Sequence, residues 1–160
     1  MKERTMKLLK LSSLSLVLMA LPLFAADSAF VGTWKLNVDR SKFEPGPAML
    51  FATVLIESSG KGLKTTASNA DGKGVASDLT FDSPLDGTSS PVTGSPVMDM
   101  ISLQRRDDHT IAATATKEGK LVYADRRVVS ADGQTLPITR RGTTPEGKQY
   151  GSTIILERLP

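Results

Sequence analysis

The sequence predicts an all-β fold, a closed antiparallel up-and-down barrel of about eight to ten strands. Short runs rich in Val, Ile, Thr and Leu alternate with pairs of an acidic residue and glycine, which suit hairpin turns because glycine adopts positive φ at little cost. The last three pairs, Glu118-Gly119, Asp132-Gly133 and Glu146-Gly147, are 14 residues apart. This regular spacing is typical of a meander. No window of 12 residues after the leader keeps the apolar stripe of a helix.

The N-terminal 25 residues predict a signal peptide. A basic segment precedes the apolar run Leu11–Ala26, which is 16 residues long and shorter than the roughly 20 residues that span a bilayer. The basic residues are Lys2, Arg4, Lys7 and Lys10. With cleavage after Ala25 or Ala26, residues 1–25 are the leader and residues 26–160 form one barrel domain, exported to the periplasm or secreted. An uncleaved anchor is the alternative.

Charge and cysteine content exclude several classes of protein. The chain has 20 basic and 17 acidic residues, of which the leader holds four and one, so the remainder carries sixteen of each. Nucleic-acid binding driven by net positive charge is therefore not expected. Without cysteine there are no disulfides, so the core and the strand ladders must supply the stability.

The expected strands follow one another along the whole domain, and each is a β-prone run between turn signals. They are Val31–Asn37, Leu50–Glu57, Leu63–Ser68, Val75–Asp82, Met98–Arg105, Thr110–Thr116, Leu121–Val129, Thr135–Arg141 and Tyr150–Glu157.

Two segments do not have the pattern of strands. Arg40–Pro47 contains Pro45-Gly46-Pro47 and is expected to be irregular, because proline blocks a helix. Ser83–Pro96 holds three prolines and two glycines and is expected to be a long loop. Loops of this length often act as lids or binding loops, and a mobile surface loop is the alternative.

Nine antiparallel strands can form a barrel or a sandwich, and the regular late meander favours the barrel, which has no exposed edges. An outer-membrane barrel is not expected, since it needs an outward apolar band with aromatic girdles. The seven aromatic residues after the leader are scattered along the chain.

The first expected strand carries a family resemblance. The run Phe30-Val31-Gly32-Thr33-Trp34-Lys35-Leu36 resembles the first strand of lipocalin and fatty-acid-binding-protein barrels, with the Gly-x-Trp pattern at Gly32 and Trp34. Its continuation to Pro47 resembles small exported bacterial lipocalin-like proteins of unassigned role, as do Pro91–Gly94 and Arg127–Gly133. The resemblance implies a calycin-type barrel and a small hydrophobic or amphipathic ligand.

The resemblance also implies a role for Trp34, which in lipocalins plugs the closed end of the barrel beneath an arginine from near the last strand. Arg158 is the candidate partner, and a plain core role for Trp34 is the alternative. Two features of fatty-acid-binding proteins are missing. Pro45 and Pro47 oppose the helical lid after the first strand, and the terminal Arg-x-Tyr that grips a carboxylate is absent.

Three arginine pairs at the ends of expected strands are candidate ligand contacts: Arg105-Arg106, Arg126-Arg127 and Arg140-Arg141. Side chains alternate between the faces of a strand, so each pair sends one guanidinium inward. The more apolar faces place Arg105, Arg126 and Arg140 inside, where they need a counter-charge or an anionic ligand. Ion pairs on the barrel exterior, with Asp125 or Glu157, are the alternative, and one β-bulge would reverse the faces.

No catalytic or metal-binding motif is evident. His109 is the only histidine, which is too few for a zinc site, and it is expected in a turn after Asp107-Asp108. No Gly-x-Ser-x-Gly elbow occurs, and no glycine-rich phosphate loop precedes a helix.

The sequence therefore predicts a non-catalytic binding protein, without metal or cofactor, that holds a small apolar or amphipathic ligand, with an anionic group as one option. An envelope scaffold or interaction protein without a small ligand is the second hypothesis. A hydrolase-like enzyme with a carboxylate pair is the third.

Overall fold

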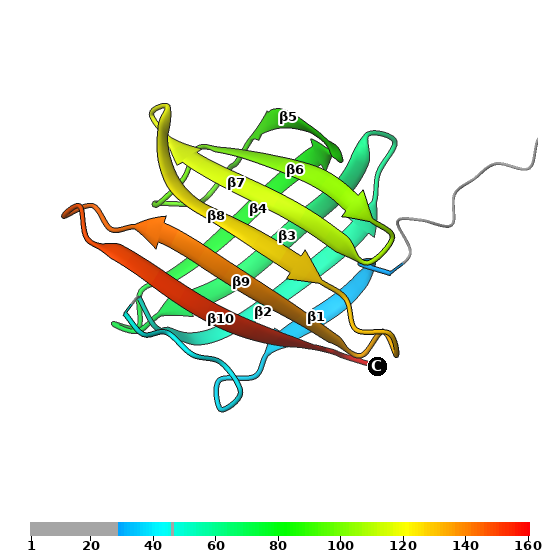
Figure 1. The fold of residues 1–160 in the computed structure, drawn as a ribbon, viewed down its shortest axis with the longest axis horizontal. Coiled ribbons are helices and arrows are strands. Elements are labelled where there is room, and N and C mark those ends of the chain that lie inside the picture. Colours follow the sequence, from blue (N-terminus) through cyan, green and yellow to red (C-terminus); the bar gives the residue numbers. More distant parts are fainter. Residues whose placement is uncertain (1–28, 46) are drawn as a thin grey trace, which may run out of the picture.

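Consecutive strands, except β4 and β5, pair with one another around a nearly closed barrel, and the first strand pairs with the last (Figure 1). The computed structural model describes residues 29–45 and 47–160, and the leader predicted for residues 1–25 lies outside these ranges. The strand order is β4-β3-β2-β1-β10-β9-β8-β7-β6-β5. The strands are β1 (Gly32–Leu36), β2 (Met49–Ser58), β3 (Gly62–Asp71), β4 (Ala76–Pro84), β5 (Asp86–Pro91), β6 (Met100–Asp107), β7 (Thr110–Lys117), β8 (Lys120–Val128), β9 (Thr135–Thr143) and β10 (Gln149–Arg158).

The predicted all-β up-and-down barrel is confirmed, and the three late acidic-Gly pairs lie at its hairpin turns. Gly119, Gly133 and Gly147 adopt positive φ between β7 and β8, β8 and β9, and β9 and β10. Because the strands run alternately up and down, the β1–β2, β3–β4, β5–β6, β7–β8 and β9–β10 connections share one end of the barrel. We call this the rim end, and the opposite end, which holds Trp34, the plug end.

The long loop expected over Ser83–Pro96 was wrong, because this segment contains β5. Its many prolines and glycines concealed a strand that is short and irregular. The register with β6 shifts between Asp86 and Ser89, and Gly87 has a φ of 91° at that point. Asp86-Gly87 is therefore an irregularity near the start of a strand, where a hairpin turn was expected.

The barrel is held together most weakly between β4 and β5. In the part of the chain that the structure describes, one isolated bridge joins β4 to the segment after β5, with Thr80 and Thr93 exchanging two backbone hydrogen bonds of 2.9 Å. Gly94, at a φ of 82°, presses against the carbonyl group of Asp78 on β4. We call this line of contact the β4–β5 seam.

Replacing Gly94 by alanine is expected to destabilise the protein by clearly more than Gly74→Ala. Both glycines have a φ of 82°, so both variants place a side chain in the left-handed region, which costs about 1–2 kcal/mol. A Cβ at Gly94 would also overlap the carbonyl oxygen of Asp78, whereas one at Gly74 meets no atom within 4 Å. Urea unfolding measures the free energy of unfolding of the two variants. Equal losses of stability would show that the close contact between Gly94 and Asp78 does not add to the cost of the substitution.

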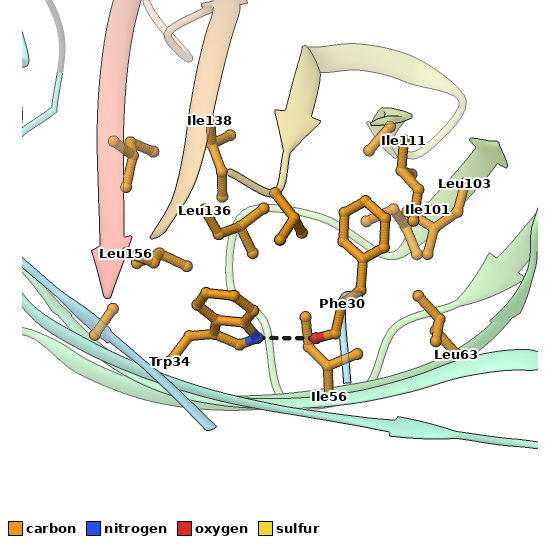
Figure 2. Packing of buried hydrophobic residues seen from close by; sticks show 14 of the residues in the cluster. Phe30, Trp34, Ile56, Leu63, Ile101, Leu103, Ile111, Leu136, Ile138 and Leu156 are labelled. Atoms are coloured by element: carbon orange, nitrogen blue, oxygen red, sulfur yellow. Dashed lines mark hydrogen bonds between the residues drawn. The ribbon is translucent and has the colours of Figure 1, made fainter. Parts of the chain in front are cut away.

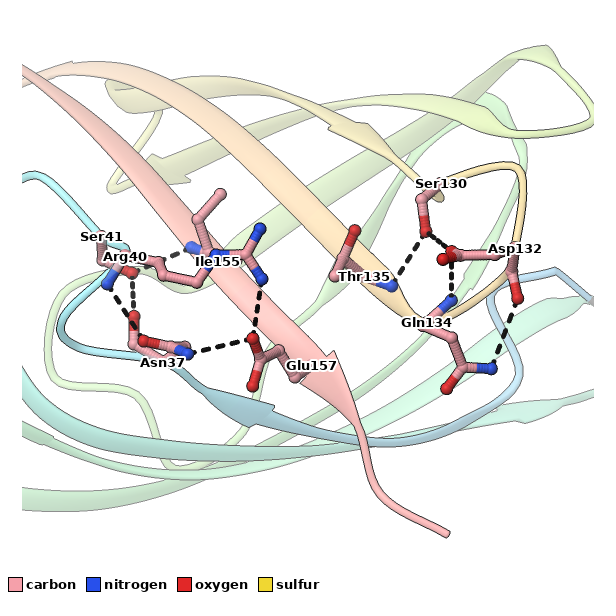
Figure 3. Close-up of polar contacts among 9 residues, drawn as sticks. All are labelled: Asn37, Arg40, Ser41, Ser130, Asp132, Gln134, Thr135, Ile155 and Glu157. Carbon is pink, nitrogen blue, oxygen red and sulfur yellow. Dashed lines mark hydrogen bonds and ion pairs between the residues drawn. The ribbon is translucent and has the colours of Figure 1, made fainter.

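The connection between β1 and β2 contains no helix in its described residues, 37–45 and 47–48. It runs beside β10 instead: Lys42 forms an isolated bridge with Thr153, and Ser41 Oγ accepts a hydrogen bond of 3.0 Å from the backbone N–H of Ile155 (Figure 3). On the outer face Glu157 accepts hydrogen bonds from Asn37 (3.0 Å) and Arg40 (2.8 Å). In its described residues this connection is therefore a non-helical strap beside β10.

The interior holds a packed apolar core that includes Trp34 at the plug end (Figure 2). Trp34 is fully buried, and its indole N–H donates a hydrogen bond of 2.9 Å to the carbonyl oxygen of Phe30. The same cluster includes aliphatic side chains from most of the strands: Ile56, Leu63, Ile101, Leu103, Ile111, Leu136, Ile138 and Leu156.

Candidate functional site

Strand register places a polar row inside the barrel. Directly paired residues of antiparallel strands share one face of the sheet. Asp125 on β8 lies opposite Ala113 on β7 and Arg140 on β9, and Arg140 lies opposite Ser152 on β10. The pairing also continues from Ala113 to Leu103, which is buried in the core, so this row faces inward.

Asp125, Arg127 and Arg140 form a charged cluster on the β8–β9 wall. The Asp125 side chain is fully buried, and its Oδ1 accepts a hydrogen bond of 2.9 Å from Arg127 Nε. Its Oδ2 accepts hydrogen bonds from Arg140, at 2.8 Å from Nη2 and 3.2 Å from Nε. The two arginine side chains are 12% and 21% exposed. Two guanidinium groups on one carboxylate leave a local excess of one positive charge.

The Arg140 guanidinium also stacks on Tyr123, with its carbon 3.7 Å from the ring centroid. This cation–π contact fixes the plane of the guanidinium and points it along the barrel wall. No described residue accepts a hydrogen bond from Arg140 Nη1. One corner of the guanidinium is therefore left to bind another acceptor.

The protonation states of the cluster follow from its geometry. Burial alone would raise the pKa of Asp125, but Arg127 and Arg140 reverse that effect and bring the pKa below its ordinary value. Burial alone would lower the pKa of Arg140, and the neighbouring Tyr123 and Asp125 raise it above its ordinary value. Both groups are therefore charged at neutral pH.

Arg105 faces the same interior. It lies opposite Ile111, which lies opposite Arg127, so these three residues form the row next to the Asp125 row on the plug-end side. The Arg105 side chain is partly buried. The structure thus brings Arg105 and Arg140 to one wall, as their apolar strand faces predicted.

Arg126 does not face inward, and that prediction was wrong. On β8 the buried residues are Tyr123 and Asp125, with Arg127 partly buried, whereas Ala124 and Arg126 are exposed. The outer face of β8 therefore holds Ala124, and the inner face carries the ring of Tyr123 and the ion pair of Asp125 with Arg127. Arg127 was missed, and its signal was Asp125 at i−2, since residues two apart share a strand face.

The residues paired directly with the cluster and with Tyr123 are small. Ala113 lies opposite Asp125, Ala115 opposite Tyr123 and Ser152 opposite Arg140, and all three are buried. Across the barrel, Val54 on β2 pairs with the inward Trp34, and register leads from Val54 through Ala67 to Leu79 on β4. Val54 and Leu79 face inward and are only partly buried, and both pack against the apolar core.

Arg158 and Trp34 lie together at the plug end. The guanidinium carbon of Arg158 is 4.1 Å from the centroid of the Trp34 ring. The same group donates to three backbone carbonyl oxygens: Ala29 (2.8 Å), Val31 (2.6 Å) and Gly133 (2.6 Å). This end of the barrel is therefore closed by a buried indole under a guanidinium that ties the first strand to the β8–β9 turn.

The other candidates from the sequence do not assemble into a site. His109 lies exposed in the β6–β7 turn, where Asp107 Oδ1 accepts a hydrogen bond of 2.9 Å from its backbone N–H. A group of three or more His, Cys, Asp or Glu residues placed to hold a metal does not occur among the described residues. Within the same ranges no helix has the length and hydrophobicity to span a membrane.

The fold and this cluster together define the class of protein: an antiparallel up-and-down β-barrel with a cationic cluster on its inner wall. No protein-family model matches the chain, and no curated protein matches it. Among solved structures it is similar to zebrafish ileal bile acid-binding protein in complex with cholic acid, with a TM-score of 0.48 and 11% sequence identity. That match covers 82% of this chain and 99% of the other.

Proposed function

We propose that this chain is an exported, non-catalytic binding protein that holds a small amphipathic molecule with an anionic group inside the barrel. The observation that carries the proposal is the inward cluster of Arg127 and Arg140 on a single carboxylate. A buried charge needs a counter-charge, and Asp125 supplies one for two guanidinium groups. A carboxylate, sulfate or phosphate group would fit the free corner of the Arg140 fork.

The surroundings of the cluster support an apolar body for the same ligand. Ala113 and Ala115 occupy the inner-wall positions paired with Asp125 and Tyr123, and the partly buried Leu79 packs against the apolar cluster that contains Tyr123. Binding sites for small molecules are mostly apolar, with a few polar groups that fix orientation. The described interior offers this combination beside Arg140.

Arg140→Lys is expected to weaken the binding of dodecyl sulfate by about tenfold or more, while the binding of 1-dodecanol changes little. Lysine keeps the positive charge but loses the planar fork, and a hydrogen bond to a charged group contributes about 1.5–3 kcal/mol. Displacement of an anionic naphthalene fluorophore measures both affinities. Arg141→Lys on the outer face of the same strand is the matched control, and Arg141 is exposed.

Two results would contradict this function. Wild-type protein that binds neither dodecyl sulfate nor the fluorophore would favour the scaffold hypothesis. An Arg140→Lys variant that loses affinity equally for dodecyl sulfate and for 1-dodecanol would show that the cluster has no role in anion recognition. Native mass spectrometry of protein recovered from its own periplasm or medium complements this test, since a retained acidic molecule is expected.

A further inference from the structure

The β4–β5 seam differs from every other line of contact around the described barrel. The other neighbouring strands share ladders of three registered pairs, between β1 and β10, to nine, between β9 and β10, some of them with a register shift. β4, by contrast, meets the segment after β5 at the single Thr80–Thr93 bridge. Regions with few backbone hydrogen bonds open at a lower free energy than the rest of a fold. The seam is therefore the part of the wall that opens most easily.

A small apolar cluster lies behind the seam and connects it to the charged cluster. Met98, Ala115 and Tyr123 are buried together, with Leu79 of β4 and Val92 packed against them. Met98 and Val92 both belong to the segment 92–99, which carries the bridge residue Thr93. Parting β4 from this segment would separate Leu79 from Val92 and Met98.

Two direct contacts link this segment to Arg140. The Tyr123 hydroxyl donates a hydrogen bond to Met98 Sδ at 3.3 Å, and the Tyr123 ring lies under the Arg140 guanidinium. The side chain that would meet an anionic ligand is thus two contacts away from the segment that closes the wall. The plug end offers no comparable route, because Trp34 is fully buried there beneath Arg158.

We propose that the β4–β5 seam is the door through which ligand enters and leaves the barrel, with the segment 92–99 as its moving part. This inference rests on the proposed function, since it concerns the passage of the same ligand. A ligand at Arg140 would also contact Tyr123, whose hydroxyl group is hydrogen-bonded to Met98. A bound ligand would therefore stabilise the closed position of the segment 92–99.

A disulfide across the seam tests the proposal. Thr80 and Thr93 exchange both backbone hydrogen bonds, and such pairs have Cα atoms about 5.5 Å apart, within the range that a disulfide spans. The natural chain has no cysteine, so Thr80→Cys/Thr93→Cys forms one defined bond. Thr53→Cys/Ser68→Cys, a directly opposed pair on the β2–β3 ladder, is the matched control.

Stopped-flow mixing with the anionic naphthalene fluorophore gives the rates. We expect oxidation of the seam variant to slow association and dissociation by about tenfold or more, with the equilibrium affinity little changed and the rates restored by reduction. The oxidised control is expected to keep wild-type rates. If the oxidised seam variant binds the fluorophore with unchanged rates and affinity, the proposal that ligand enters through the seam is wrong, while the proposed function is unaffected. Failure of the wild-type protein to bind the fluorophore would overturn both.

Discussion

Asp125→Asn is expected to lower the free energy of unfolding by about 3–5 kcal/mol. The substitution keeps the size of the side chain but removes the charge that both Arg127 and Arg140 bind. Two partly buried guanidinium groups would then face each other without a counter-charge, and the asparagine NH₂ group cannot accept the hydrogen bonds that one carboxylate oxygen accepts. Urea unfolding followed by the fluorescence of the single tryptophan measures the loss.

Asp78→Asn is the matched control for this variant. Asp78 is exposed on β4, and exposed substitutions of this kind change stability by about 0.5 kcal/mol or less. A loss in Asp125→Asn no larger than that of the control would mean that the cluster contributes nothing to the fold.

At acidic pH, the wild-type protein and Asp125→Asn should have similar free energies of unfolding. The pKa of Asp125 is lower in the folded state than its unfolded value of about 3.9, so the carboxylate contributes stability above that pH. The contribution is lost as the pH falls through the lower, folded pKa. The gap in unfolding free energy should be constant near neutral pH and narrow below about pH 4.

Trp34→Ala is expected to cost about 3–5 kcal/mol, because it empties the centre of the plug-end core. Trp34 is fully buried, and its loss also removes the ring beneath Arg158 and leaves the Phe30 carbonyl oxygen without its indole donor. Far-UV circular dichroism in urea measures the effect, since the variant has no tryptophan fluorescence.

Two further variants calibrate that loss. Trp34→Phe should cost less than Trp34→Ala, because a ring remains beneath the guanidinium. Leu55→Ala, on the exposed outer side of β2, should change stability little. A Trp34→Ala variant as stable as Leu55→Ala would show that the indole does not support the closed end.

The sequence was sufficient to predict the barrel because its local and global signals agree. Glycines with positive φ at 119, 133 and 147 mark real hairpins, and β-prone runs lie between them. β5 was not predicted because it is short and contains Gly87 and Pro91, residues that usually mark loops. It lies at the seam, where few backbone hydrogen bonds join it to β4. Composition alone cannot separate such a strand from a loop.

The charged cluster was only partly predictable, since the inner face of β8 is polar. Hydrophobicity predicted the wrong face because Ala124 and Val122 outweighed Tyr123, although Arg127, two residues after Asp125, is a local ion-pair partner for it. The second partner, Arg140, is fifteen residues from Asp125, and its contact depends on the register that the β8–β9 turn sets. Arg140 itself was assigned correctly because Leu136 and Ile138 on the same face are buried.

The pairing of β1 with β10 has a consequence for when the barrel can form. β1 is made first, yet one of its edges stays unpaired until residues 149–158 leave the ribosome. The Arg158 guanidinium, which ties the start of the first strand to the β8–β9 turn, belongs to the same last strand. A growing chain therefore cannot close the barrel before β10 is available.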